Sequence, residues 1–488
     1  MSYIHGSYGE LANSKAQNAA QAGSVAVYIG TAPVHQISGY AEKGLINTPV
    51  KIENLSDAKA KLGWSDDWEK YTLCEAIAAH FNNTVGNVGP IYVINVLDPS
   101  VHAGEKVVAE AVVMNNDSFS IPSVDVVRDS IVVSDHASAE FTIEYDSKMN
   151  VTVVKLKHDC DKKEAAVSYD LVDTSKVTAA TIIGSTTEDG QYSGLDALKL
   201  LYQEHNAVIN MLAAPGWSQI PEVYKAMVSA VQKLNGHWDG FVNADIPLVD
   251  AEGAAIDTIA KAIKWKADNG YTSERSKVYW PMVKDGSGKV YHLSTVGQAT
   301  MLRVDLGHDS VPFESPSNKE IMATCQYFGK DSKNKGYDQV TCNGLNEKGI
   351  TTACFWGGRW VLWGPHTAAY NYGGNMDARS IFDSNIRMLM HLTNGFQLRH
   401  GVRVDAPLTP QEKDTILNVE RENLDTLCGI GALIGSPTVE FVESANPVSD
   451  MMNGDFVWDI SGTPTPPLKS ATGRVCYTDE GFAAFFGE

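Results

Sequence analysis

The chain has 488 residues and is acidic, with 39 Lys and Arg against 59 Asp and Glu and a formal net charge of −20 at pH 7. This charge argues against a general nucleic-acid-binding protein, whose binding surface is usually basic. No stretch reaches the roughly 18 apolar residues of a membrane span, and the start lacks the basic and apolar blocks of a secretory signal. The hydrophobic content of 43% can form large cores, and the length predicts about three domains.

Residues 1–23 are small and polar, and Tyr3, Ile4 and Tyr8 are their only sizeable apolar side chains before Leu11. Such a segment has too little apolar surface to build a core of its own. Two interpretations remain open at this point. The segment is either a disordered tail, or an extended arm that becomes ordered by adding a strand to the sheet of another subunit.

Residues 24–100 alternate between buried-type strands and amphipathic helices. The predicted strands are SVAVYIGTA (24–32), TPVKIENL (48–55) and PIYVINVL (90–97). The predicted helices are SDAKAKLG (56–63), capped by Ser56, and TLCEAIAAHF (72–81). This alternation is typical of an α/β unit.

Residues 101–183 have a different sequence pattern, in which short β-rich runs and turn-prone pieces replace the helical periodicity. The runs include VVAEAVVMNN (107–116), AEFTIEYD (139–146), MNVTVVKLKH (149–158) and KVTAATIIG (176–184). Regularly spaced short strands predict a small β-sandwich or barrel. Since the alternation of strands and helices resumes at Gly184, we interpret residues 101–183 as an insertion. The resumed pattern has helices over 194–206, 221–234 and 254–266, and strands over 208–213, 240–246 and 277–283.

The stretch after Gly349 begins with two aromatic β-prone runs between Phe355 and Trp363, split by Gly357-Gly358, which predicts a hairpin. A helix follows, with apolar residues at three- and four-residue steps up to Phe396. Asn375 and Asp377 are its candidate N-caps, and Gly395 and Gly401 its candidate ends. The helix is locally basic, which indicates either a solvated face or a docking face for an acidic partner; its main cations are Arg379, Arg387 and Arg399.

The last part of the chain is predicted to hold an acidic helix over 409–427 and strands over 438–443, 454–460 and 474–478. The final eight residues contain Phe482, Phe485 and Phe486. A free apolar end is unusual unless another surface covers it.

Signatures of catalysis are missing from the sequence. The GSGK of residues 286–289 resembles the end of a phosphate-binding loop, but Val283 stands where the loop requires Gly and Val290 where it requires Ser or Thr. Gly-x-Ser-x-Gly and His-Glu-x-x-His are absent, and the seven cysteines include no Cys-x-x-Cys pair. We therefore predict no catalytic, cofactor-binding or metal site.

Taken together, these residues resemble the sheath protein of contractile phage tails and of related contractile particles such as R-type bacteriocins. The similarity covers most of the chain and weakens between Val101 and Ile183. The matching pieces are VYIGTAP (27–33), TPVKIENLSDAKAKLG (48–63), AAPGWSQIP (213–221), NADIP (243–247), SPSNK (315–319) and Trp363-Gly364 with His366-Thr367. The family usually has Arg at the position of His366.

The resemblance implies an α+β multidomain chain and a structural protein, not an enzyme. Its α/β core would comprise 24–100 and 184–348, with an inserted β-sandwich or barrel at 101–183. The C-terminal sheath domain would span 349–472, and extended arms would occupy 1–23 and 473–488. Such subunits are expected to polymerise as stacked hexameric rings around an inner tube, and to contract without a cofactor so that the tube is driven through the target envelope.

The expected partners are further copies of the chain, the tail tube protein, and the baseplate and tail terminator proteins, without direct nucleic-acid contact or membrane insertion. The expected place is the virion tail or a tailocin particle, assembled in the bacterial host cytoplasm. We expect Arg379, Arg387 and Arg399 to face the tube. The arms are expected to contact neighbouring subunits through Tyr3, Ile4, Tyr8, Val475, Tyr477, Phe482, Phe485 and Phe486.

Two other classes of protein fit parts of the sequence. One is an α/β enzyme with a β-rich accessory domain, which ligand-dependent thermal stability would reveal. The other is a monomeric adhesin-like binding protein, which only the β-rich insertion supports. Light scattering separates it from a sheath subunit, because a sheath polymerises.

Overall fold

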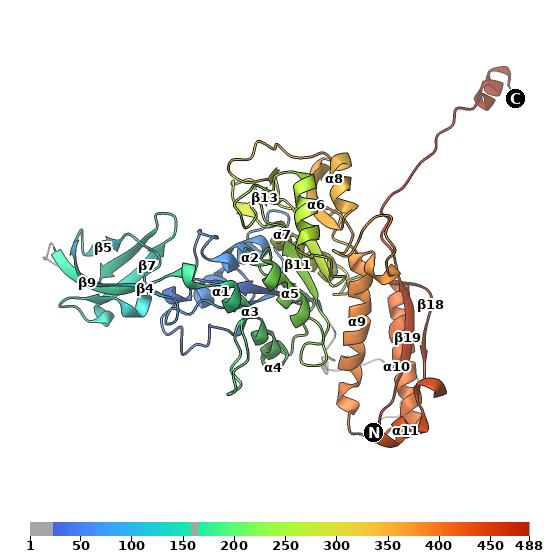
Figure 1. The fold of residues 1–488 in the computed structure, drawn as a ribbon, viewed down its shortest axis with the longest axis horizontal. Coiled ribbons are helices and arrows are strands. Elements are labelled where there is room, and N and C mark those ends of the chain that lie inside the picture. The colour runs from blue at the N-terminus through green and yellow to red at the C-terminus, as the bar shows by residue number, and fades with distance from the viewer. Residues whose placement is uncertain (1–22, 158–163, 488) are drawn as a thin grey trace, which may run out of the picture.

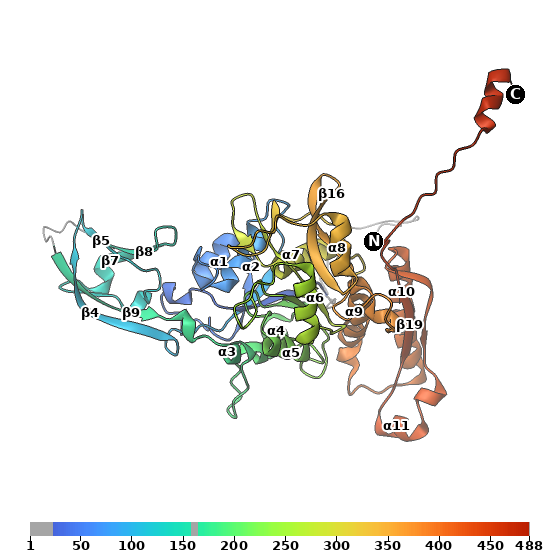
Figure 2. The ribbon, with the colours of Figure 1, turned by 45° about the horizontal axis from the view of Figure 1, so that its top comes forward.

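The computed structural model describes residues 23–157 and 164–487. Figures 1 and 2 show an elongated molecule with three parts along its length. A β-rich lobe lies at one end, a large sheet with its helices lies in the middle, and two long helices with a β-hairpin lie at the other end. The C-terminal segment leaves the body beside that hairpin.

The middle part is built on an eight-stranded sheet with the order β17-β16-β12-β11-β10-β1-β3-β2. Its six inner strands are parallel, and the two edge strands run antiparallel to them. The α/β alternation predicted from the sequence is therefore confirmed. The strands are β1 (Ala26–Gly30), β2 (Pro49–Ile52), β3 (Ile91–Asn95), β10 (Met211–Ala213), β11 (Phe241–Asp245), β12 (Ser276–Tyr279), β16 (Ile350–Trp356) and β17 (Arg359–Trp363).

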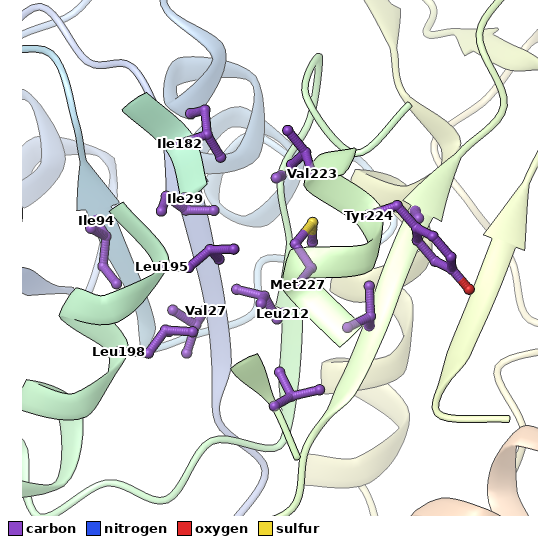
Figure 3. Packing of buried hydrophobic residues seen from close by; sticks show 14 of the residues in the cluster. Val27, Ile29, Ile94, Ile182, Leu195, Leu198, Leu212, Val223, Tyr224 and Met227 are labelled. Carbon is purple, nitrogen blue, oxygen red and sulfur yellow. The ribbon is translucent and has the colours of Figure 1, made fainter. Parts of the chain in front are cut away.

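Helices cover both faces of this sheet, as expected when the strands are apolar throughout. In β1, Val27 and Ile29 point into one core, while Ala26 and Tyr28 point into the core on the opposite face. Figure 3 shows the first core, where β1, β3 and β10 meet α5 and its neighbours. The helices of this part are α1 (Leu55–Leu62), α2 (Thr72–Phe81), α3 (Ala179–Ile183), α4 (Leu200–His205), α5 (Pro221–Ala230), α6 (Ile259–Asp268), α7 (Leu293–Leu306) and α8 (Gln339–Asn346).

Two local predictions in this part need correction. Asn54, not Ser56, caps α1, because its side chain accepts a hydrogen bond from the Asp57 backbone N–H. The run KVTAATIIG, predicted as β-rich, instead contains α3, whose Ile182 is buried in the core beside the sheet. Local β propensity was overridden there by tertiary packing. A small side sheet has the order β14-β13-β15 and consists of β13 (Met282–Lys284), β14 (Val290–Tyr291) and β15 (Cys325–Tyr327).

The lobe at the far end consists of two three-stranded antiparallel sheets, ordered β4-β9-β6 and β5-β8-β7. Both contribute to one hydrophobic cluster that includes Phe119, Val154 and Val167. The predicted change to β-rich structure is confirmed. The strands are β4 (Ala103–Val113), β5 (Ser118–Ile121), β6 (Val132–Val133), β7 (Phe141–Asp146), β8 (Val151–Leu156) and β9 (Glu164–Val172).

The predicted hairpin at Gly357-Gly358 is confirmed, since β16 and β17 pair around this turn and both glycines have positive φ angles, 59° and 81°. The helix after it, α9, spans Asp383–His400. It begins later than predicted, because Asp377 caps a separate 3-10 turn, and it runs through Gly395 to end at Gly401.

The long helix α10 (Pro410–Gly429) confirms the predicted acidic helix, and the Thr409 side chain caps it. After α10 come β18 (Leu433–Glu440), α11 (Val448–Asn453) and β19 (Asp459–Pro464). The strand predicted over 454–460 was placed too early, since β19 starts at Asp459. The strand predicted over 474–478 was wrong for the single chain, where the segment pairs with no described strand.

Candidate assembly surfaces

The C-terminal segment from Thr472 to Phe486 lies apart from the rest of its own chain, whereas Thr465 still hydrogen-bonds to Gly431 and Ala432 after the hairpin. The segment is extended up to a short 3-10 helix, Glu480–Phe486, and projects from the body in both views (Figures 1 and 2). Its apolar side chains are open to solvent, with Val475 98% and Phe485 82% exposed. Tyr477, Phe482 and Phe486 are exposed as well. Apolar surface of this kind is suited to burial against another chain.

The hairpin of β18 and β19 is the second open surface. It is a two-stranded sheet, so each strand has one edge that no other described strand pairs with. Two strands alone are marginally stable, and one face of this pair is supported by α9 and α10 through a shared apolar cluster with Leu433 and Val439. The unpaired edges offer backbone N–H and C=O groups to a further strand.

Arg387 does not contribute to any surface, so the prediction that it faces the tube is wrong. Its side chain on α9 is 1% exposed and forms a salt bridge with Asp305 on α7. It also donates to the side-chain oxygen of Asn210 at 3.1 Å. Asp305 in turn accepts a hydrogen bond from Ser24, just before β1, at 2.7 Å. Arg387 therefore ties α9 to α7 and to the start of the first strand.

The other two arginines lie in different surroundings. Arg399, near the end of α9, is 24% exposed and donates twice to Glu420 on α10, with both N···O distances 2.8 Å. Arg379 precedes α9, is 54% exposed and pairs with Asp377 and Glu274. The three side chains therefore do not form one continuous basic face on the described chain.

Glu420 is the centre of the contact between α9 and α10. Besides Arg399 it binds His400, whose Nε2 atom lies 2.6 Å from the carboxylate. Burial opposes ionisation of Glu420, but the hydrogen bonds from His400 and Arg399 outweigh it and hold the pKa of this carboxyl below its usual value. Sequence patterns did not predict this cluster, because its members lie on two separate helices, α9 and α10.

His366, the position where the family usually has Arg, is buried between aromatic rings. It stacks on Tyr370 with ring centroids 3.5 Å apart, and it also stacks on Phe382. Its Nδ1 atom lies 2.9 Å from the Ile381 carbonyl oxygen. Burial lowers the pKa of His366 to about 4, so the imidazole is neutral at pH 7. Its role in the single chain is to pack the loop before α9.

Tyr3, Ile4 and Tyr8 lie outside the described residues. Within the described ranges, no helix is both long and apolar enough to cross a membrane. Across the same residues, no group of three or more His, Cys, Asp and Glu side chains is arranged to hold a metal ion.

Comparison with known proteins gives a consistent picture, although no protein-family model matches the chain. The tail sheath protein of Burkholderia phage BcepMu is 26% identical over 471 residues, which are 93% of this chain and 92% of the relative. A putative prophage major tail sheath protein of Pseudomonas aeruginosa is 23% identical over 316 residues, covering 64% of this chain and 77% of the relative.

Solved structures show the same fold. A chain of the anti-feeding prophage baseplate matches with a TM-score of 0.56 at 14% identity, covering 98% of this chain and 100% of that chain. A chain of the contracted PVC sheath complex, an extracellular contractile injection system, matches with a TM-score of 0.55 at 13% identity and 99% coverage of both chains. The curated relatives are named as tail sheath proteins, and this similarity favours a structural subunit over the enzyme alternative. Over most of its length the chain is therefore similar to tail sheath proteins of contractile phages, and it shares its fold with chains of related contractile particles.

Proposed function

We propose that the chain is the repeating subunit of a sheath that polymerises as stacked hexameric rings around an inner tube. The observation that carries the proposal is the C-terminal segment, whose apolar side chains no described part of its own chain covers. A contact between this segment and a different surface on the next copy is heterologous. Contacts of that kind generate rings or helical filaments rather than closed dimers.

The two arms, 1–23 and 473–488, are the proposed links between copies. Extended segments bind by adding strands to open sheet edges, and the β18–β19 hairpin has two such edges. Backbone hydrogen bonds made this way tolerate sequence differences and hold copies together while their bodies move. Tyr3, Ile4, Tyr8, Val475 and Tyr477 are the side chains proposed to pack beside these added strands.

Contraction is proposed to occur by sliding and rotation of subunits as rigid bodies, which drives the tube through the target envelope. The free energy would come from the difference in subunit contacts between two states, so no nucleotide is required. Rigidity is supported by two buried ion pairs that tie α9 to the core, Lys277 with Asp383 and Arg387 with Asp305. The remaining proposed partners are the tube, baseplate and terminator proteins, joined during assembly in the host cytoplasm.

We also propose the domain division 24–100 with 184–348 for the core, 101–183 for the insertion and 349–472 for the C-terminal sheath domain. Two sheets around one shared apolar cluster favour a small β-sandwich for the insertion. Its position at the far end of the molecule suits an outward-facing lobe (Figure 1). Arg379 and Arg399 stay candidates for tube contact, because both side chains are partly exposed.

Negative-stain microscopy of the purified full chain tests the assembly proposal. We expect striated tubes or stacked rings at high protein concentration. A chain that ends at residue 472 should keep its unfolding midpoint and fail to form them, because the removed residues pack on no described part of the body. A full chain that stays monomeric by light scattering at every concentration, with or without the purified tube protein, would contradict the proposal.

A further inference from the structure

A deep groove lies between the core and the C-terminal helices, with a volume of about 1530 Å³. Tyr202 and Trp238 line it from the core side, with ring centroids 5.1 Å apart. Phe396 on α9 and Trp458 before β19 line it from the other side, with centroids 6.2 Å apart. The groove is larger than the roughly 300–1,000 Å³ typical of small-molecule sites, so its size suits a peptide segment.

Side-chain hydrogen bonds hold the two walls of the groove together. The amide of Asn394 on α9 accepts from the Asp239 backbone N–H at 3.0 Å and donates to the Asp239 carbonyl at 2.8 Å. Gln397, one turn later, donates to the His237 carbonyl at 3.0 Å. The groove is therefore present before any occupant binds, which reduces the ordering cost of binding.

Two residues that line the groove have a polar hydrogen buried beneath its surface. The indole N–H of Trp458 and the Nε–H of Arg403 are buried and donate no hydrogen bond within the described chain. An occupant with apolar side chains would cover the rings, and its carboxylates would pair with the Arg403 side chain, which lines the groove and is 32% exposed.

The end of the chain has this chemistry. Phe482 and Phe485 stack on the short 3-10 helix with ring centroids 6.2 Å apart, and Phe486 is exposed beside them. Asp479 and Glu480 precede the three phenylalanines and supply carboxylates. No other stretch of exposed residues in the described chain combines three phenylalanines with acidic neighbours.

The position of this segment favours a second copy over the same copy. The chain leaves the body after β19, next to Ile430 and His366 and therefore near the start of α9. The groove lies at the end of α9, beside Phe396 and His400. The two places are separated by the length of this 18-residue helix, about 27 Å. The segment projects away from the molecular body on the side opposite α11 (Figures 1 and 2).

We propose that residues 479–486 of one copy dock into this groove on a second copy, with the phenylalanine rings against Trp238, Phe396 and Trp458. The proposal rests on the proposed function, in which copies associate through their termini. It adds a defined receiving site, distinct from the open edges of the β18–β19 hairpin. Each copy then has one inserted segment and one filled groove, and such a contact repeats without closing on itself.

A direct test titrates a fluorescent peptide of residues 473–488 into the full chain. Val402 and Val404 line the groove and are 88% and 73% exposed, so Val402→Glu/Val404→Glu leaves the core intact. We expect this variant to bind the peptide at least about tenfold more weakly, because the new carboxylates would be buried against the rings. The matched control is Val108→Glu/Val113→Glu on β4, equally exposed and expected to bind normally. Absence of peptide binding, or equal binding by both variants, would overturn the proposal.

A second measurement separates insertion into the same copy from insertion into a neighbour. Phe485 is replaced by the photo-cross-linker p-benzoylphenylalanine, and copies with and without heavy isotopes are mixed before assembly. We expect cross-links from one isotopic form to residues 394–408 or 453–458 of the other. Cross-links within one copy, or to the hairpin edges, overturn the groove proposal while the sheath function stands. If no copies assemble, the proposed sheath function is contradicted. The peptide titration then still tests whether the C-terminal segment binds the groove.

Discussion

The Lys277 ammonium group and the Asp383 carboxylate lie 2.6 Å apart, and neither side chain is accessible to solvent. Lys277 lies on β12 of the central sheet, and Asp383 is the first residue of α9. Lys277 also donates to the Gly364 carbonyl at 2.6 Å. The pair therefore joins the sheet, the loop after β17 and the helix that leads to the C-terminal hairpin.

Breaking this pair should destabilise the chain strongly. We expect Asp383→Asn to lower the free energy of unfolding by about 3–5 kcal/mol, because it leaves a buried ammonium group without its counter-charge. The double variant Lys277→Met/Asp383→Asn should lower the free energy of unfolding by less than the two single variants do together. The measurement is urea unfolding followed by tryptophan fluorescence. Asp268→Asn, at the exposed pair with Lys264, is the control and should change stability by less than about 1 kcal/mol.

His292 should make stability fall at alkaline pH. Burial opposes its protonation, but Glu75, 2.8 Å from Nδ1, outweighs this and raises the pKa of His292 from 6.5 to about 9. Because the folded pKa exceeds the unfolded one, the stabilisation is complete below pH 6.5 and disappears as pH rises through 9. The resulting decrease in the free energy of unfolding should approach about 3 kcal/mol. His292→Gln should be less stable at pH 6 and should lack this decline, as measured by urea unfolding between pH 6 and 9.5. If the free energy of unfolding changed with pH equally in the wild type and in His292→Gln, the raised pKa of His292 would be contradicted.

His366 should make stability fall at acidic pH. Its folded pKa of about 4 lies below the ordinary value of 6.5, so its contribution is complete above pH 6.5 and declines as pH falls toward 4. A phenylalanine can keep the stacking on Tyr370 without the charge. Between pH 7 and pH 4 the free energy of unfolding should therefore fall less for His366→Phe than for the wild type, by up to about 3 kcal/mol. Thermal unfolding across this range measures the difference, and equal acid sensitivity would refute it.

Gly297 should be intolerant of any side chain. A Cβ atom at this position of α7 would lie 2.5 Å from a ring carbon of Tyr279, which is fully buried on β12. We expect Gly297→Ala to destabilise by about 1–3 kcal/mol through overpacking, despite the better helix propensity of alanine. Gly344→Ala in α8 is the matched control, because its Cβ would meet no atom within 4 Å. That variant should be neutral or more stable by up to about 1 kcal/mol.

The sequence by itself determined the elements whose residues carry their own signal. The run from Ala26 to Gly30 is apolar throughout because both of its faces are covered, and it became a central strand. Gly357-Gly358 fixed a hairpin, since few other residues tolerate two successive positive φ angles. The acidic helix predicted over 409–427 corresponds to α10, which spans Pro410–Gly429. These signals are local, so they survive without knowledge of the fold.

Only the tertiary structure decided what each polar or aromatic side chain faces. Arg387 and Arg399 lie on one helix, yet Arg387 meets Asp305, 82 residues earlier, inside the core. The groove likewise joins Trp238 to Trp458, two residues with no relation in sequence, because α9 packs between the core and the hairpin. The physical reason is that burial and partner depend on segments distant along the chain. Periodicity reports only that a residue belongs to a helix or strand, and the packing of those elements decides what its side chain does.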